Sequence, residues 1–480
     1  MWKAKEPVRS PQASFSRRSL LKGAGASLLA LGARPALAAT PDAGFTTLRA
    51  RKASAQLLPE AEPATEVWAY EGMVPGPILR VPQGKSVKAL LRNELDQDTS
   101  IHWHGIRIDN AMDGVVGLTQ NGVKPGEDFA YEFTAPDAGT YWYHPHNRSW
   151  EQVARGLYGV LIVEESDPPQ VERDIALVVD DWRLNEAGAI DEASMGSLHD
   201  RAHAGRLGNV LTLNGADIWE QPVRSGERIR LRLISTANAR IMRLRLEEHN
   251  PWLIALDGQP VTPSPLAGGE IRLAPGQRAD LMIDMELDPG SSAAISEVSA
   301  QGRLVAGHFL YHESEVVRSQ PLDAPIALPA GKLPERTDTQ GALEVPLLME
   351  GGAMGGLTGA VYKGELLGIQ ELARNHGMAW AFNGIAGRTP EPLFEVEKGR
   401  PVVLRMVNET SWPHGIHIHG HHAQVFAPGE ATPWRDTHLL DPQEEVAVAF
   451  VADNPGKWMI HCHMLEHQAA GMGTWFHVKG

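Results

Sequence analysis

A strict alternation of apolar and polar residues marks several short segments of this 480-residue chain. The clearest is Arg228 to Ile234, with the sequence RIRLRLI. A period of two places the apolar side chains on one face, so this segment predicts a half-buried β-strand. Long helical periodicity is scarce, and turn signals recur about every ten residues. The pattern therefore predicts an all-β protein built from β-sandwiches.

This segment belongs to a pattern that occurs three times along the chain. Each copy has a glycine turn, a short apolar run, a second glycine turn and an alternating strand. The three strands are expected at residues 86–93, 228–234 and 402–408. Each is followed by a turn and another alternating segment, at 123–133, 273–285 and 441–451. We therefore expect three sandwich domains of one design.

Turn-rich stretches suggest where these domains meet. Asp167-Pro168-Pro169 and the Pro- and Gly-rich segment 321–337 are the expected limits. The predicted domains are residues 40–167, 168–325 and 326–480.

The first 39 residues are typical of an export signal rather than of a fold. Arg17 and Arg18 precede a weakly apolar stretch at 23–31, and Ala36-Leu37-Ala38 offers small residues for cleavage. Paired arginines indicate the twin-arginine translocation machinery. We expect a mature protein that begins near Ala39 or Thr40 and lies in the periplasm.

Charge and hydropathy narrow the partners of the mature protein. The net charge of −15 argues against nucleic acid, whose phosphates would be repelled. Beyond the signal, no stretch is long and apolar enough to span a bilayer. A monomer is expected.

Cys462 is the only cysteine of the chain, so no intramolecular disulfide forms. A lone thiol in an exported protein is a hazard unless something occupies it, and a metal ion would do so.

Histidine motifs link the first and third domains. His102-Trp103-His104-Gly105 corresponds to His417-Ile418-His419-Gly420, and the segment 139–146 corresponds to 456–463. The middle domain has neither motif. We interpret the outer domains as sharing one site, with the middle domain as a spacer.

The four His-X-His pairs indicate metal binding, because residues i and i+2 of a strand project from the same face. Eight imidazoles are too many for one ion, and imidazole binds Cu, Zn, Fe or Ni, so the pairs alone do not name the metal. Cys462 lies between His461 and His463, and its sulfur is expected on the opposite face. With His414, His467 and Met472 it would form a blue-copper centre of one thiolate, two imidazoles and a weak thioether.

The segments HWHG, HPH, HGIHIHG and HCHMLEHQAAGM together resemble the multicopper oxidases, a family that includes laccases and copper-efflux oxidases. The resemblance spans about residues 45 to 480. It implies three cupredoxin-like Greek-key β-sandwich domains and four copper ions. It assigns His414, Cys462, His467 and Met472 to the type 1 copper, and His102 and His417 to the type 2 copper. It assigns His104, His144 and His463 to one type 3 copper, and His146, His419 and His461 to the other.

The resemblance also implies a reaction. A small reducing substrate gives single electrons to the type 1 copper, and Cys462 passes them to the trinuclear cluster, where dioxygen becomes water. Asp113 resembles the family's acidic residue near the type 2 water and is expected to take part in proton supply. Gln468 stands where bacterial relatives often carry Glu and cannot supply a proton, so we expect another or slower route, through Glu466 or ordered water.

The substrate class follows less directly. Met349, Met354 and Met378 are scattered, and Thr410 and Trp412 stand where copper-oxidising members carry an acid and a methionine. This favours a laccase-like role on phenols or aromatic amines. Oxidation of cuprous or other metal ions in copper tolerance is the alternative. A copper-sequestering protein, in which oxidase activity is incidental, is a less favoured alternative. The complete ligand set argues against a non-catalytic periplasmic assembly protein that has lost copper.

Overall fold

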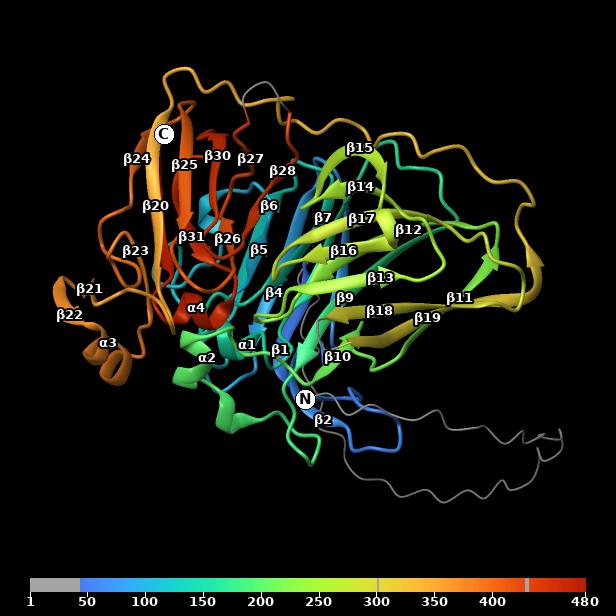
Figure 1. Cartoon of the computed structure of the whole chain (residues 1–480), viewed down its shortest axis with the longest axis horizontal. Helices are drawn as coiled ribbons and strands as arrows, with labels where there is room; N and C mark the ends of the chain where they lie inside the picture. Colours follow the sequence, from blue (N-terminus) through green and yellow to red (C-terminus); the bar gives the residue numbers. More distant parts are fainter. Residues whose placement is uncertain (1–43, 300–301, 428–430) are drawn as a thin grey trace, which may run out of the picture. The chain divides into compact units, whose positions relative to one another are not determined.

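The structure is a computed structural model that describes residues 44–299, 302–427 and 431–480; the predicted export signal lies outside them. Strands dominate the described residues and form three pairs of sheets (Figure 1), which confirms the all-β prediction. Residues 46–480 form one compact unit. The described helices are α1 (Ser149–Gln152), α2 (Leu198–Ala202), α3 (Ile369–His376) and α4 (Leu465–Ala469), and a separate hairpin pairs β21 (Gly359–Tyr362) with β22 (Glu365–Gly368).

The first pair of sheets, the first sandwich, encloses a shared apolar core. In spatial order, one sheet has β2 (Thr65–Tyr70), β1 (Thr46–Ala55), β4 (Ser86–Asn93) and β6 (Asp128–Thr134). The other has β3 (Gly76–Pro82), β8 (Gly159–Glu164), β7 (Gly139–His144) and β5 (His102–His104).

The second pair, the middle sandwich, has larger sheets. One has β10 (Val210–Leu213), β9 (Arg173–Trp182), β12 (Arg228–Ser235), β17 (Arg278–Asp284), β14 (Trp252–Leu256) and β15 (Gln259–Pro265). The other has β11 (Trp219–Ser225), β19 (Gly302–Val316), β18 (Ser292–Ser299), β13 (Met242–Leu246) and β16 (Glu270–Leu273).

The third pair, the third sandwich, also encloses one apolar core. One sheet has β23 (Trp380–Phe382), β20 (Leu343–Gly351), β25 (Pro401–Asn408), β30 (Glu445–Val451), β27 (Ala423–Val425) and β28 (Trp434–Arg435). The other has β24 (Glu395–Glu397), β32 (Gly473–Lys479), β31 (Gly456–Cys462), β26 (His414–Ile418) and β29 (Thr437–Leu440).

The threefold sequence pattern corresponds to a threefold structural unit. The alternating strands β4, β12 and β25 pair antiparallel with β6, β17 and β30, which are the predicted downstream segments. Each also has a parallel neighbour, β1, β9 or β20. The predicted domain limits fall between the last strand of one sandwich and the first strand of the next, and they remain predictions.

Strand β12 departs from the prediction, because it is buried on both faces. Its polar face carries Arg230, 2.6 Å from Asp280, and Arg232, 2.6 Å from Asp174. The half-buried prediction was wrong because buried arginines are tolerated where carboxylates neutralise them.

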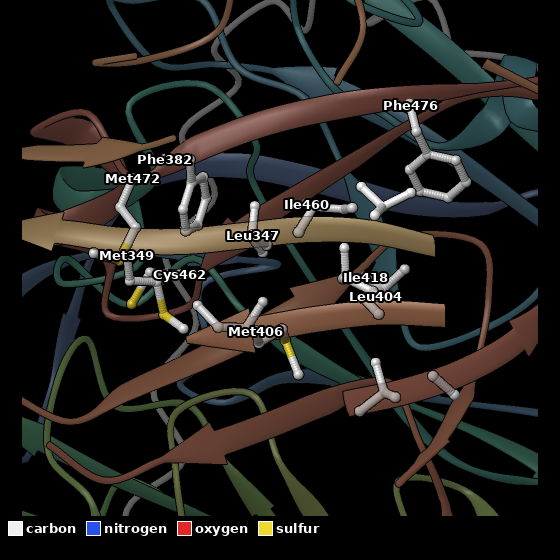
Figure 2. Packing of buried hydrophobic residues seen from close by; sticks show 14 of the residues in the cluster. Leu347, Met349, Phe382, Leu404, Met406, Ile418, Ile460, Cys462, Met472 and Phe476 are labelled. Carbon is white, nitrogen blue, oxygen red and sulfur yellow. The ribbon is translucent and has the colours of Figure 1, made fainter. Parts of the chain in front are cut away.

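The core of the third sandwich surrounds the lone cysteine. Figure 2 shows Cys462 and Met472 packed near Met349 and Phe382 in this cluster. Both sulfur-bearing side chains are fully buried. The thiol is therefore held in the apolar interior of the sandwich.

Candidate metal centres

Cys462 lies against two imidazoles at the end of β31. Its Sγ is 3.6 Å from His414 Nδ1 and 3.8 Å from His467 Nδ1, and these two nitrogens are 3.1 Å apart. The Cys462 amide donates a hydrogen bond to the Met472 carbonyl at 3.0 Å, which keeps the methionine beside this group. The structure thus brings together the four residues predicted for a type 1 centre.

Hydrogen bonds on the outer side of the imidazoles decide where their lone pairs point. His467 Nε2 donates to the carbonyl of His203 at 2.7 Å, and a carbonyl only accepts, so Nδ1 carries the lone pair. His414 Nε2 lies 2.9 Å from Thr410 Oγ1, whose single hydrogen is directed to Asn408 Oδ1 at 2.7 Å. Both Nδ1 lone pairs therefore face each other and the sulfur. They repel unless a cation lies between them.

The protonation of this group suits a soft metal. Burial raises the pKa of the Cys462 thiol to about 12 and lowers the pKa of His467 to about 4. The imidazoles are therefore neutral, the form that binds metal, and a cation would displace the thiol proton. Thiolate, imidazole and thioether donors together suit copper.

A second group of eight imidazoles gathers between the first and third sandwiches. The strand register sets His102 opposite His144 and His417 opposite His461. Rings from the two sandwiches stack, with centroids 4.0 Å apart for His102 and His419. The group, the histidine cluster, consists of the eight predicted residues: His102, His104, His144, His146, His417, His419, His461 and His463.

Three Nε2 atoms of the histidine cluster converge. His461 Nε2 is 3.1 Å from His419 Nε2 and 3.3 Å from His146 Nε2. His461 Nδ1 donates to the Cys462 carbonyl at 2.9 Å, so its Nε2 carries a lone pair. His419 Nδ1 lies 3.1 Å from both carboxylate oxygens of Asp113, which leaves its Nε2 in the same state. The three atoms fit one cation.

Other nitrogens of the histidine cluster are buried with no hydrogen-bond partner. Such orphaned atoms are rare in proteins and need an explanation. A bound metal would satisfy one nitrogen of each ring, and burial lowers the pKa of seven of the eight histidines in the cluster, so each of these seven rings keeps a free lone pair. The orphaned atoms are His102 Nε2, His104 Nδ1, His144 Nε2, His417 Nε2 and both ring nitrogens of His463.

Asp113 lies where the sequence predicted an acid. It is buried, its carbonyl accepts from His102 Nδ1 at 2.7 Å, and its carboxylate accepts from His419. It thereby orients one histidine from each outer sandwich.

Asp436 is a second buried acid, which the sequence analysis missed. Its Oδ1 is 3.2 Å from His104 Nε2, and its carbonyl accepts from His417 Nδ1 at 2.9 Å. Burial alone would raise the pKa of Asp436, but Arg278, and then His104, hold its pKa well below the usual value. No spacing motif surrounds this residue, so its position follows only from the packing.

The middle sandwich closes one side of the histidine cluster and is more than the spacer that we predicted. Arg278 of β17 is fully buried and pairs with Asp436 at 2.6 Å. Gly276, with φ of +83°, approaches so closely that a Cβ there would lie 2.9 Å from His104 and 3.0 Å from His463. The spacer prediction failed because the contribution comes from one arginine and one turn, without histidines.

Glu466, an expected proton donor, contacts the middle sandwich instead. Its carboxylate accepts from Asn238 Nδ2 at 2.9 Å and from the Arg206 amide at 3.2 Å. Burial raises the pKa of Glu466. Among the described residues it forms no hydrogen bond with a histidine of the cluster, so its contacts are those of a tether for α4.

Fold and site together define a copper-dependent oxidoreductase. Family models described as multicopper oxidase match residues 52–168, 172–298 and 365–480. The chain therefore belongs to the multicopper oxidase family.

Individual relatives agree with this assignment. The chain is 29% identical to multicopper oxidase MmcO of Mycobacterium tuberculosis, over 96% of each chain. Among solved structures, Lac15 from a marine microbial metagenome is 39% identical, with a TM-score of 0.72 over 90% of this chain and 99% of that one. A multi-copper oxidase from Pseudomonas thermotolerans is 31% identical, with a TM-score of 0.77 over 90% and 98% of the two chains. None of the described helices is long and apolar enough to cross a membrane.

Proposed function

We propose that this protein is a laccase-like oxidase. It takes single electrons from small phenols or aromatic amines and uses four of them to reduce dioxygen to two waters. One observation carries the proposal: β31 places Cys462 in the sulfur-containing centre and the neighbouring His461 in the histidine cluster. One strand therefore belongs to both candidate centres.

The proposed cofactor is four copper ions, with the ligands assigned by resemblance. His414, Cys462, His467 and Met472 would hold the type 1 ion, and His102 and His417 the type 2 ion. The two type 3 ions would be held by His104, His144 and His463, and by His146, His419 and His461. When bound, the copper ions would accept single electrons and reduce dioxygen.

The chain's own groups would connect and orient the two centres. From Cys462 Sγ, the covalent path runs through the cysteine to its carbonyl, which accepts from His461 Nδ1 at 2.9 Å. This short path favours electron transfer between the centres. Asp113, which accepts hydrogen bonds from His102 and His419, would pass protons that reach it on toward the histidine cluster.

The placements of five residues support organic donors over cuprous ion. Met349 is buried in the core, Met354 is 77% exposed, and Met378 lines a separate cavity, so they form no common thioether site. The Thr410 hydroxyl is engaged with His414, and the Trp412 indole lies edge-on to His203. An aromatic donor would find an aromatic surface here.

Names among the relatives span both substrate classes. The chain is 26% identical to Laccase-1 of Botryotinia fuckeliana and 24% identical to copper resistance protein A of Pseudomonas syringae, over 85% and 84% of its length. Oxidation of cuprous ion is therefore the competing reaction in the test.

The proposed oligomeric state is a monomer. The proposed location is the periplasm, reached by the twin-arginine route, and the support for this location is the sequence of residues 16–38. Export in a folded state is compatible with loading of copper before translocation.

The test is purification with copper, a copper count, an absorption spectrum and oxygen uptake with a phenol and with Cu(I). We expect four coppers, a blue colour and faster uptake with the phenol. Cys462→Ser should abolish colour and turnover. Met464→Leu is the matched control, because Met464 is buried nearby and belongs to no proposed ligand set. A colourless protein without oxygen uptake would overturn the proposal.

A further inference from the structure

The histidine cluster meets solvent at a single residue among its eight members. His146 is 7% exposed, whereas the other seven are at most 1% exposed. His146 lines a cavity of about 450 Å³ between the first and third sandwiches. This cavity is therefore the place where a small molecule would approach the cluster.

The walls of the cavity are cationic. Arg148, Lys363 and Arg388 line it, and none of its described lining residues is Asp or Glu. Arg148 is neutralised by Glu151 at 2.6 Å. A local excess of positive charge is notable in a chain with a net charge of −15.

Two of these cations have no acidic partner. Lys363 Nζ lies 5.1 Å from the ring centroid of Tyr362, and Arg388 donates to the Val116 carbonyl at 3.1 Å. Within the described residues neither forms an ion pair. Both side chains are exposed, so an anion in solution can reach them. The cavity thus offers two uncompensated cations to an anion.

No side chain of the cavity is a carboxylic acid that could donate a proton. Gln468 lines the cavity, and its side chain ends in an amide. This amide forms no hydrogen bond with the described residues. The acids near the two centres are engaged elsewhere: Asp113 with His419, and Glu466 with Asn238. Reduction of one dioxygen consumes four electrons and four protons and forms two waters.

We propose that this cavity binds a small carboxylate. Its protonated form, the carboxylic acid, is in equilibrium with the bound anion and donates protons to dioxygen reduction. Lys363 and Arg388 hold the anion, and the Gln468 amide donates to it. Four molecules of acid lose four protons per dioxygen, and the anions regain protons from solvent. The anion site rests on the cavity alone, whereas proton donation rests on the proposed oxidase function.

The test uses the copper-loaded protein with acetate as the probe. Acetate binding is measured by calorimetric titration, and oxygen uptake is measured against acetate concentration at fixed pH, with perchlorate keeping the ionic strength constant. We expect saturable binding and a saturable rise in uptake. In the Lys363→Gln/Arg388→Gln double variant, binding should weaken about tenfold, because two weak ion pairs are lost.

Lys398→Gln/Arg400→Gln is the matched control. Both residues are exposed, and Arg400, like Arg388, donates to one backbone carbonyl. Equal acetate effects in both double variants and the unchanged protein would overturn the site. Saturable binding without any effect on uptake would overturn the proton-donating role. If the protein shows no oxygen uptake at all, the oxidase proposal fails, and the titration still decides the anion site.

Discussion

Arg278 donates to both carboxylate oxygens of Asp436, at 2.9 and 2.6 Å. The arginine belongs to the middle sandwich and the aspartate to the third, while Asp436 also contacts His104 of the first. All three sandwiches therefore meet at one buried ion pair. Because Asp436 stays ionised, it is a fixed acceptor for the His104 ring.

Removing Arg278 alone should destabilise the protein strongly. Arg278→Gln leaves the Asp436 charge buried and uncompensated, which costs about 3–5 kcal/mol of unfolding free energy. Asp436→Asn in the same chain should recover part of this loss. Denaturant unfolding of the single and double variants measures both effects.

The control for this pair is Arg272→Gln, which breaks the exposed pair with Asp441. Its cost should be below about 1 kcal/mol. If the single and double variants of the buried pair unfold at the same denaturant concentration, the compensation argued for Arg278 is wrong.

Asp113→Asn should impair the histidine cluster without affecting the sulfur-containing centre. The amide weakens the acceptor of His419 Nδ1, while the Asp113 carbonyl bond to His102 is retained. Loss of such an outer partner lowers metal affinity or activity about 10- to 100-fold. Oxygen uptake should fall by this factor while the blue colour persists.

Asp109→Asn is the matched control, because Asp109 is an exposed acid that caps the turn before Asp113. Equal losses in both variants would show that the effect of Asp113→Asn is general rather than specific to the cluster.

Local patterns were enough to predict the strands and their neighbours. Alternation and turns are properties of adjacent residues, so β4, β12 and β25 and their partner strands could be assigned from the sequence. The gathering of the predicted ligands followed from the i, i+2 geometry of strands.

Contacts between distant segments could not be predicted in this way. Arg278 and Asp436 are 158 positions apart, and only the packing of two sandwiches joins them. The complete burial of β12 has the same origin. The acceptor of His467 is a backbone carbonyl, at His203, and a carbonyl leaves no signature in residue type.

Thr410→Val should weaken the sulfur-containing centre selectively. Valine keeps the shape of threonine but removes the oxygen that accepts from His414 Nε2 at 2.9 Å. The imidazole then loses the partner that fixes its tautomer, and copper affinity at this centre should fall about 10- to 100-fold. Titration of the blue colour with a copper chelator measures the change.

Ser411→Ala is the adjacent control, because Ser411 is exposed and its hydroxyl, within the described part of the chain, bonds only the Met354 carbonyl, at 3.4 Å. Its colour should resist the chelator as the unchanged protein does. Equal chelator sensitivity of Thr410→Val and the unchanged protein would mean that Thr410 does not position His414.

His438 should make the metal-free protein sensitive to acid. Burial, and then the charge of Arg435, lower the pKa of His438 to about 4, against the opposite effects of Asp257 and Asp436. The unfolded chain binds this proton near pH 6.5. The stabilisation is therefore present above pH 6.5 and is lost as the pH falls toward 4, by roughly 3 kcal/mol in total.

His438→Gln should flatten the curve of unfolding free energy against pH by that amount. His199→Gln, which replaces a ring that is 75% exposed, is the control variant. Parallel curves for His438→Gln and the unchanged protein between pH 6.5 and 4 would contradict the assignment, because only a histidine that is neutral in the folded state produces this slope.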